Sequence, residues 1–209
     1  MKTLLKISIE HDPDVENPAG EDNWWKLYSF SRRHHNFKHP DEIRSHYGIG
    51  LLSKLRHGTA FWLGYFEHGQ CQWALSGEQW QCPWDSVNRA GILIADLKDL
   101  PMGFENRQRV ACNFCEIYTD WCNGNCYWYS IKKTEVPDDW DGDPDGDIAR
   151  NDWEGVDSCG GFIGDSGLAE AIQESIKSSG LSNAEPAIVT GDCKWFADYH
   201  NLMPKGTRK

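Results

Sequence analysis

The sequence predicts an α+β fold, with a mainly antiparallel sheet, about three helices packed on it and one expanded acidic hairpin loop. Two observations indicate this class. Short aromatic or β-branched runs are bounded by turn residues, and they alternate with stretches whose apolar residues recur at helical spacing. The 209 residues include 11 tryptophans, which supply apolar area for a core. We expect one domain over residues 1–180 and a partly ordered C-terminal extension over 181–209.

Strands are expected where aromatic or β-branched residues gather between turn signals. Residues 59–75 read as a hairpin, because His68-Gly69 separates two such runs. The other predicted strands span residues 3–9, 24–30, 92–97, 125–136 and 153–164.

Helices are expected where end signals frame an apolar periodicity. Proline in the first turn and glycine beyond the end mark the first helix, whose middle is weakened by Gly48 and Gly50. An Asn-Gly pair ends the second, and an Asp-Ser pair is a suitable cap for the third. The predicted helices span residues 40–56, 104–124 and 165–180, with a further short one near 192–200.

The segment DGDPDGDIARND, residues 141–152, has the order of an EF-hand calcium loop. Carboxylates at alternate places converge on the ion, glycine permits the sharp turn, and a later backbone carbonyl and acid complete the shell. The predicted metal ligands are therefore Asp141, Asp143, Asp145, Asp147 and Asp152.

Three features of this loop depart from an EF-hand. Its flanks are expected to be strands, Pro144 is inserted among the ligands, and Asp152 is shorter than the usual glutamate. The EF-hand order predicts calcium, and magnesium is the alternative because short ligands lower the coordination number and the affinity for calcium. The competing interpretation is a solvated hairpin loop in which aspartate and glycine serve turn chemistry.

Charge and targeting signals limit the classes of partner. The net charge is −11, and residues 135–157 hold ten acidic residues against one basic residue. The acidity is therefore local, and no lysine or arginine stripe indicates nucleic-acid binding. We find no apolar run of membrane-spanning length and no secretory signal, so we expect no membrane association and reduced thiols in a cytoplasm.

Four cysteines lie close together in the sequence and raise the alternative of zinc. Their spacing is poor for that ion, because the first two fall inside a predicted helix, and we favour buried thiols acting as small hydrophobes. These residues are Cys112, Cys115, Cys122 and Cys126. No familiar catalytic motif is present, and a thiol nucleophile at Cys159 is weakly supported, so we predict no catalytic residues.

An arginine pair follows the predicted strand 24–30 and suits binding of an anion such as phosphate. We expect Arg32 and Arg33 to line a ligand pocket with the aromatic side chains of Trp84 and Tyr127. The alternative is a solvated pair at the end of a sheet.

Four short segments, SFSRRHHNF, QCPWDS, YTDWCNGNCYWY and VDSCGGFIG, occur in this order. Together they resemble a family of uncharacterised proteins encoded by bacteriophages and prophages, over roughly residues 24–175. Family members have a shorter hairpin before the DSC segment, so the resemblance implies that the acidic loop is an addition to the fold. It implies a phage context and no mechanism.

Three functions are consistent with these features. The first is a non-catalytic phage accessory protein that binds a host or defence protein in the host cytoplasm, with exposed tryptophans as anchors. The second is a binder or sponge for a small anionic ligand such as a nucleotide, held by the arginine pair. The third is a metal-dependent hydrolase that uses Asp85, Asp157 and the acidic loop.

Overall fold

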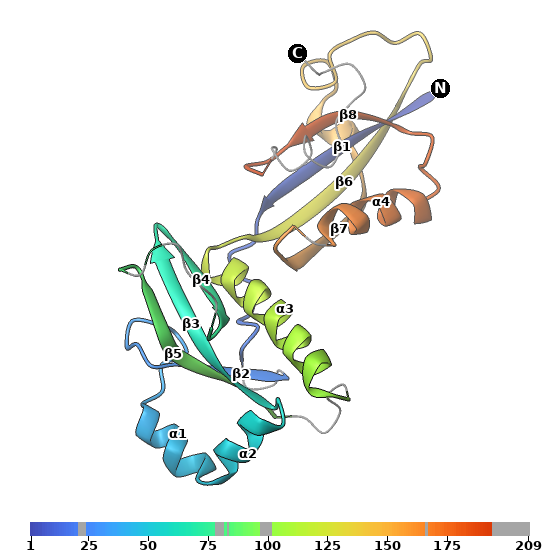
Figure 1. Cartoon of the computed structure of the whole chain (residues 1–209). Helices are drawn as coiled ribbons and strands as arrows, with labels where there is room; N and C mark the ends of the chain where they lie inside the picture. Colours follow the sequence, from blue (N-terminus) through green and yellow to red (C-terminus); the bar gives the residue numbers. More distant parts are fainter. Residues whose placement is uncertain (21–23, 78–81, 83, 97–101, 166, 194–209) are drawn as a thin grey trace. The chain divides into compact units, whose positions relative to one another are not determined.

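The structure is a computed structural model, and it describes residues 1–20, 24–77, 82, 84–96, 102–165 and 167–193. These residues contain four α-helices and eight strands, and the strands form two four-stranded sheets (Figure 1). This content confirms the predicted α+β class. The chain contacts divide into two compact units where the sequence suggested one domain. We call residues 16–123 the middle unit, and residues 1–15 with 124–209 the terminal unit.

The sheet of the middle unit has the strand order β2-β5-β3-β4, and all of its pairings are antiparallel. The predicted hairpin is confirmed as β3 and β4, which turn at Gly69 with a φ of 80°. The elements of this unit are β2 (Trp25–Ser29), α1 (Pro40–Tyr47), α2 (Gly50–Arg56), β3 (Ala60–His68), β4 (Gln70–Leu75), β5 (Ser86–Ala95) and α3 (Phe104–Cys122).

Both faces of this sheet are apolar, because successive side chains of a strand point to opposite faces. On one face, Leu63 and its neighbours pack against Tyr118 and Cys115 of α3. On the other face, Ile92 and Ala60 pack in a cluster that includes residues of α1 and α2. The middle unit is therefore a sheet between two helical layers.

The predicted helix 40–56 is two helices, because the chain turns at Gly48. Gly48 has a φ of 50°, a left-handed value that glycine adopts without steric cost. Its backbone N–H closes α1 by donating to the carbonyl of Arg44 at 2.8 Å. The position where the glycines were expected to weaken one helix is therefore the end of α1.

The sheet of the terminal unit has the order β7-β6-β1-β8. Strands β1, β6 and β7 pair antiparallel, whereas β8 runs parallel to β1. Helix α4 packs on one face through Leu168 and Ile172, against Ile7 and Ile131 of the sheet. The elements are β1 (Lys2–His11), β6 (Cys126–Val136), β7 (Glu154–Ile163), α4 (Leu168–Ser178) and β8 (Glu185–Thr190).

The acidic loop connects β6 to β7, as predicted, and a 3-10 turn over Arg150–Asp152 ends it. A small apolar cluster under the loop contains Trp140, Ile148 and Trp153. Strand β8 lies in the segment that we expected to be only partly ordered. The short helix expected near 192–200 lies, from residue 194 onward, outside the described residues, and residues 192 and 193 are a turn. No helix among the described residues combines the length and apolarity needed to cross a membrane.

Candidate functional site

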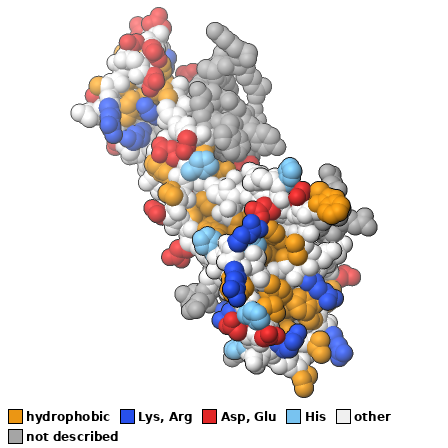
Figure 2. All heavy atoms as spheres, turned by 90° about the vertical axis from the view of Figure 1, so that its left-hand side faces the viewer, with side chains coloured by type: hydrophobic (Ala, Val, Ile, Leu, Met, Phe, Trp, Pro, Cys, Tyr) orange, Lys and Arg blue, Asp and Glu red, His pale blue; other side chains and the backbone are white. Residues whose placement is uncertain are grey.

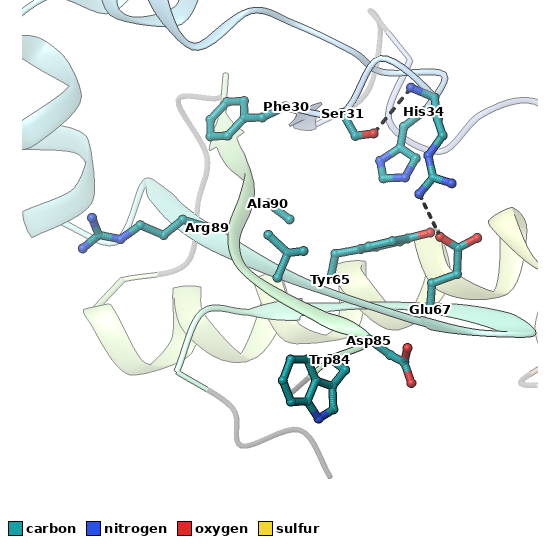
Figure 3. A pocket seen from close by; sticks show the side chains of 11 residues that line it. Phe30, Ser31, His34, Tyr65, Glu67, Trp84, Asp85, Arg89 and Ala90 are labelled. Carbon is teal, nitrogen blue, oxygen red and sulfur yellow. Dashed lines mark hydrogen bonds and ion pairs between the residues drawn. The ribbon is translucent and has the colours of Figure 1, made fainter. Parts of the chain in front are cut away.

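A cavity of about 400 Å³ opens on the middle unit, where the loop after β2 meets β3 and β5. Figure 3 shows His34 on one side of the Tyr65 ring, Trp84 and Asp85 on the other, and Arg89 extending away from them. The lining residues are Phe30, Ser31, Arg33, His34, Tyr65, Glu67, Trp84, Asp85, Val87, Arg89 and Ala90.

The carboxylate of Glu67 binds two other polar side chains that line the cavity, those of Arg33 and Tyr65. Arg33 lies with Nη2 at 3.4 Å from Oε2 of Glu67, and the Tyr65 side chain also hydrogen-bonds to Glu67. Burial of the Tyr65 ring, followed by this hydrogen bond, raises the pKa of Tyr65. The phenol therefore stays neutral and remains a donor, while the arginine already has a carboxylate partner.

His34 is held in place from behind the cavity. Its Nδ1 lies 2.6 Å from the Oγ of Ser29, which is completely buried at the end of β2. The imidazole packs against Tyr65, with ring centroids 4.6 Å apart. Burial, followed by the positive charge of Arg33, lowers the pKa of His34. The cavity therefore presents a neutral imidazole at neutral pH, not a third cation.

The remaining charges nearly balance. Asp85 is paired with His68, at 3.1 Å between Oδ2 and Nδ1. Hydrogen bonds from Cys82 and then from His68 lower the pKa of Asp85, which favours its ionised form. Two arginines and two carboxylates therefore line this cavity, although Arg89 extends away toward the Trp62 ring, and the site has little net charge.

Trp84 dominates the apolar part of the cavity. Its side chain is 92% exposed, and Val87 beside it is 54% exposed. Figure 2 shows hydrophobic side chains lying between basic and acidic ones over the lower part of the view, which holds the middle unit. Trp84 and Val87 therefore present exposed apolar surface beside charges of both signs.

A second cavity, of about 300 Å³, adjoins the first and shares Arg33, His34, Tyr65 and Glu67 with it. Cys71 of β4 and Cys122 of α3 line it. A hydrogen bond between these thiols lowers the pKa of Cys71 and raises the pKa of Cys122. Asn123 fixes their spacing, because its side-chain amide pairs with both the N–H and the carbonyl of Cys71 at 2.9 Å.

The structure brings together two of the four residues predicted to bind a ligand, Arg33 and Trp84. Arg32 does not line the cavity, since its guanidinium lies 5.9 Å from the Phe37 ring centroid. Tyr127, which was also predicted to line the ligand pocket, does not line this cavity. It is only 2% exposed, in the core of the terminal unit, because the alternation of β6 directs it toward α4.

The five predicted metal ligands are all exposed in the acidic loop. Asp143 accepts a hydrogen bond from the N–H of Asp145 at 3.1 Å, and Asp147 accepts one from the N–H of Asp143 at 2.7 Å. Asp145 also lies 3.6 Å from the ammonium group of Lys6. Turn hydrogen bonds and an ion pair therefore occupy three of the five carboxylates.

Among the described residues, one group of three histidine, cysteine or acidic side chains has potential ligand atoms within 4.8 Å of one another: His11, Asp192 and Cys193. The backbone N–H of His11 and the thiol of Cys193 both donate a hydrogen bond to the carboxylate of Asp192, at 3.1 and 3.5 Å. A nitrogen, oxygen and sulfur set suits a transition metal such as zinc. No sequence motif indicated this group, because β8 brings it to β1 only in the folded chain.

Sequence reasoning also missed Tyr65, Glu67 and Arg89 of the cavity. The alternation of β3 and β5 was the available signal, but the loop that faces them cannot be placed from a pattern. Comparisons with protein-family models, curated proteins and solved structures find no match to this chain.

Proposed function

We propose that this chain is a phage-encoded, non-catalytic accessory protein that binds a host or defence protein in the host cytoplasm. The observation that supports this best is Trp84, a 92%-exposed tryptophan at the edge of a cavity with charges of both signs. Tryptophan and arginine are enriched among residues that dominate binding energy, and a partner that covers Trp84 removes a large apolar area from water.

The experiment is capture of partners from host lysate by the tagged chain and by two tryptophan variants. Trp84→Ala is expected to lower recovery of a specific partner about tenfold or more, the usual effect of losing a central aromatic anchor. Trp24→Ala is the matched control, because Trp24 is 60% exposed in the same unit and outside the cavity. Equal recovery by Trp84→Ala, or the absence of a specific partner, contradicts the proposal.

A second candidate is a binder or sponge for a small anionic ligand such as a nucleotide. Its support is that Arg33 and Trp84 line one cavity, whose volume of about 400 Å³ suits a small molecule. The ion pair of Arg33 with Glu67 and the balanced charge make this the weaker candidate. Calorimetry with nucleotides separates the two, since Arg33→Ala abolishes binding here and Arg44→Ala, which alters an exposed arginine of α1, does not.

The hydrolase alternative has the least support. The Oδ2 of Asp157 accepts hydrogen bonds from Tyr129 at 2.8 Å and from Ser175 at 2.6 Å, which indicates a structural role. Asp85 is paired with His68. Neither carboxylate belongs to the group of potential metal ligands found among the described residues.

We further propose that the acidic loop binds calcium, with magnesium as the alternative. An ion would replace the turn hydrogen bonds of the aspartates, and binding to the native state alone raises its stability by mass action. We expect the unfolding midpoint of metal-stripped protein to rise and saturate with calcium, as measured by a thermal melt. The double variant Asp141→Ala/Asp145→Ala should show no such rise, and an unchanged wild-type midpoint in both ions would leave only a solvated loop.

A further inference from the structure

One face of the sheet of the terminal unit is apolar, and the other is polar along its middle, with an apolar cluster of Leu4, Val136 and Ile188 at one end. Odd-numbered residues of β1, from Leu5 to Ile9, point into the core with α4. The even-numbered residues Lys6, Ser8 and Glu10 are half-buried and line a cavity of about 470 Å³ on the other face. The acidic loop contributes further side chains to this cavity, among them Arg150 and Trp153.

Three cations converge on this cavity. Lys6 of β1 lies directly opposite Lys132 of β6 in the antiparallel register. Like charges in this arrangement repel and destabilise a sheet. Lys6 has a partner in Asp145 at 3.6 Å, but the side chains of Lys132 and Arg150 have no ion pair or hydrogen bond within the described part of the chain. The side chains of Lys132 and Arg150 therefore supply two local positive charges for an anion, which must outweigh the opposing carboxylates of Glu10 and of the acidic loop.

Hydroxyl groups form a row across the floor of the same cavity. Ser8 of β1 pairs in register with Ser130 of β6 on one side and with Thr190 of β8 on the other. All three line the cavity, and the hydroxyls of Ser130 and Thr190 can donate to an anionic oxygen, whereas Ser8 already donates its one proton to Glu10. Glu10 is the remaining carboxylate, and it accepts a hydrogen bond from Ser8 at 2.9 Å.

Two tryptophans line the cavity beside these polar groups, and the half-buried Trp128 offers the accessible indole face, because Trp153 is only 8% exposed. Trp128 projects from β6 on the same face as Ser130 and Lys132, and Trp153 lies at the end of the acidic loop. Indole faces stack on planar rings, including nucleobases. Cations, hydroxyls and indoles in one concavity therefore match a ligand with both an anionic and a planar aromatic part.

We propose that this polar face is a binding site for a nucleoside phosphate. The phosphate lies on Lys132 and Arg150 near the hydroxyls of Ser130 and Thr190, and the base lies against Trp128. The site is distinct from the cavity around Trp84, which belongs to the middle unit, and it does not depend on the proposed partner binding. It uses none of Arg32, Arg33, Trp84 and Tyr127.

The test is calorimetry of the full chain with ATP, GTP, CTP and UTP in the presence of a chelator, which removes divalent ions from the acidic loop. We expect at least one nucleotide to bind, with an affinity that falls as salt is added. Lys132→Thr and Arg150→Ala should each weaken that binding about tenfold, the effect of losing one charge-assisted contact. Lys133→Thr is the matched control, because Lys133 is the next residue of β6, on the opposite face and paired with Glu154 at 3.4 Å.

A thermal melt of the same variants excludes a purely structural role for Lys132. Loss of the repulsion with Lys6 should leave the midpoint of ligand-free Lys132→Thr unchanged or raised, whereas nucleotide should raise the wild-type midpoint only. Absence of binding by all four nucleotides overturns the proposal. Binding that survives Lys132→Thr and Arg150→Ala, or that is lost in Arg33→Ala instead, overturns it too.

Discussion

Replacement of Gly91 by alanine is expected to lower the free energy of unfolding of the middle unit by about 3 kcal/mol. Gly91 is buried in β5, between β2 and β3. A Cβ added there would lie 2.5 Å from the carbonyl oxygen of Tyr28 and 3.3 Å from the Cα of Ser29. Both neighbours are backbone atoms, so β2 itself must shift, and with it Ser29, which holds His34 at the cavity.

Chemical denaturation followed by tryptophan fluorescence measures this effect, since Trp25 and Trp73 are buried in the middle unit. Gly50→Ala is the matched control, because nothing lies within 4 Å of its added Cβ and it begins α2 in an ordinary conformation. Alanine is the better helix former, so this variant should be as stable as the wild type or slightly more stable. A Gly91→Ala protein of wild-type stability would show that β2 does not approach β5 this closely.

Replacement of Asp157 by alanine is expected to destabilise the terminal unit by about 1 kcal/mol at neutral pH, because Asp157 itself is exposed and solvent screens its interactions. Asp157 of β7 accepts hydrogen bonds from Ser175 of α4 and Tyr129 of β6, whose side chains are buried. Without the carboxylate, both hydroxyls lose their acceptor, and water at this exposed position replaces it only in part. The contact that ties α4 to two strands is also lost.

The effect of Asp157→Ala should depend on pH. Hydrogen bonds from Ser175 and then from Tyr129 lower the pKa of Asp157 in the folded chain, below the unfolded value of about 3.9. The ionised form is therefore favoured by folding, and its contribution is present above the unfolded pKa and is lost as the pH falls through the folded pKa.

Denaturation at a series of pH values should thus show the difference between wild type and Asp157→Ala narrowing in acid. Asp139→Ala is the control, because Asp139 is exposed and has no partner among the described residues, and it should change stability little at any pH. A difference that stays constant from neutral pH into acid would mean that the carboxylate is not the acceptor of these bonds.

The elements that local patterns define were predictable from the sequence. The alternation around His68-Gly69 identified the hairpin of β3 and β4, and the Asn-Gly pair at residues 123 and 124 identified the end of α3. The placement of the acidic loop between two strands followed from the residues on either side of it. Each of these features depends on neighbours in the sequence.

Features that depend on distant pairing were not predictable in this way. β8 is recognisable as a strand only once β1 is available as its parallel neighbour. The opposition of Lys6 and Lys132 is a matter of register, because a slip of one residue would direct Lys132 to the other face. For the same reason, Tyr127 was assigned to a ligand pocket although the register of β6 places it in a core.

Two of the four residues predicted to line one ligand pocket do line one cavity. Arg33 and Trp84 line the same cavity although 50 residues lie between them in the sequence, because the loop after β2 and the start of β5 lie on the same side of β3. Arg32, the next residue, is directed to Phe37 instead.

Oxidative footprinting of the chain, free and bound to the partner that it captures, tests the central claim most directly. Trp84 is 92% exposed in the free chain, so hydroxyl radicals should oxidise it readily. We predict that the partner protects Trp84 strongly and leaves Trp24 as reactive as in the free chain. A complex in which Trp84 stays as reactive as in the free chain, while another surface becomes protected, would show that the cavity around Trp84 is not where this protein binds.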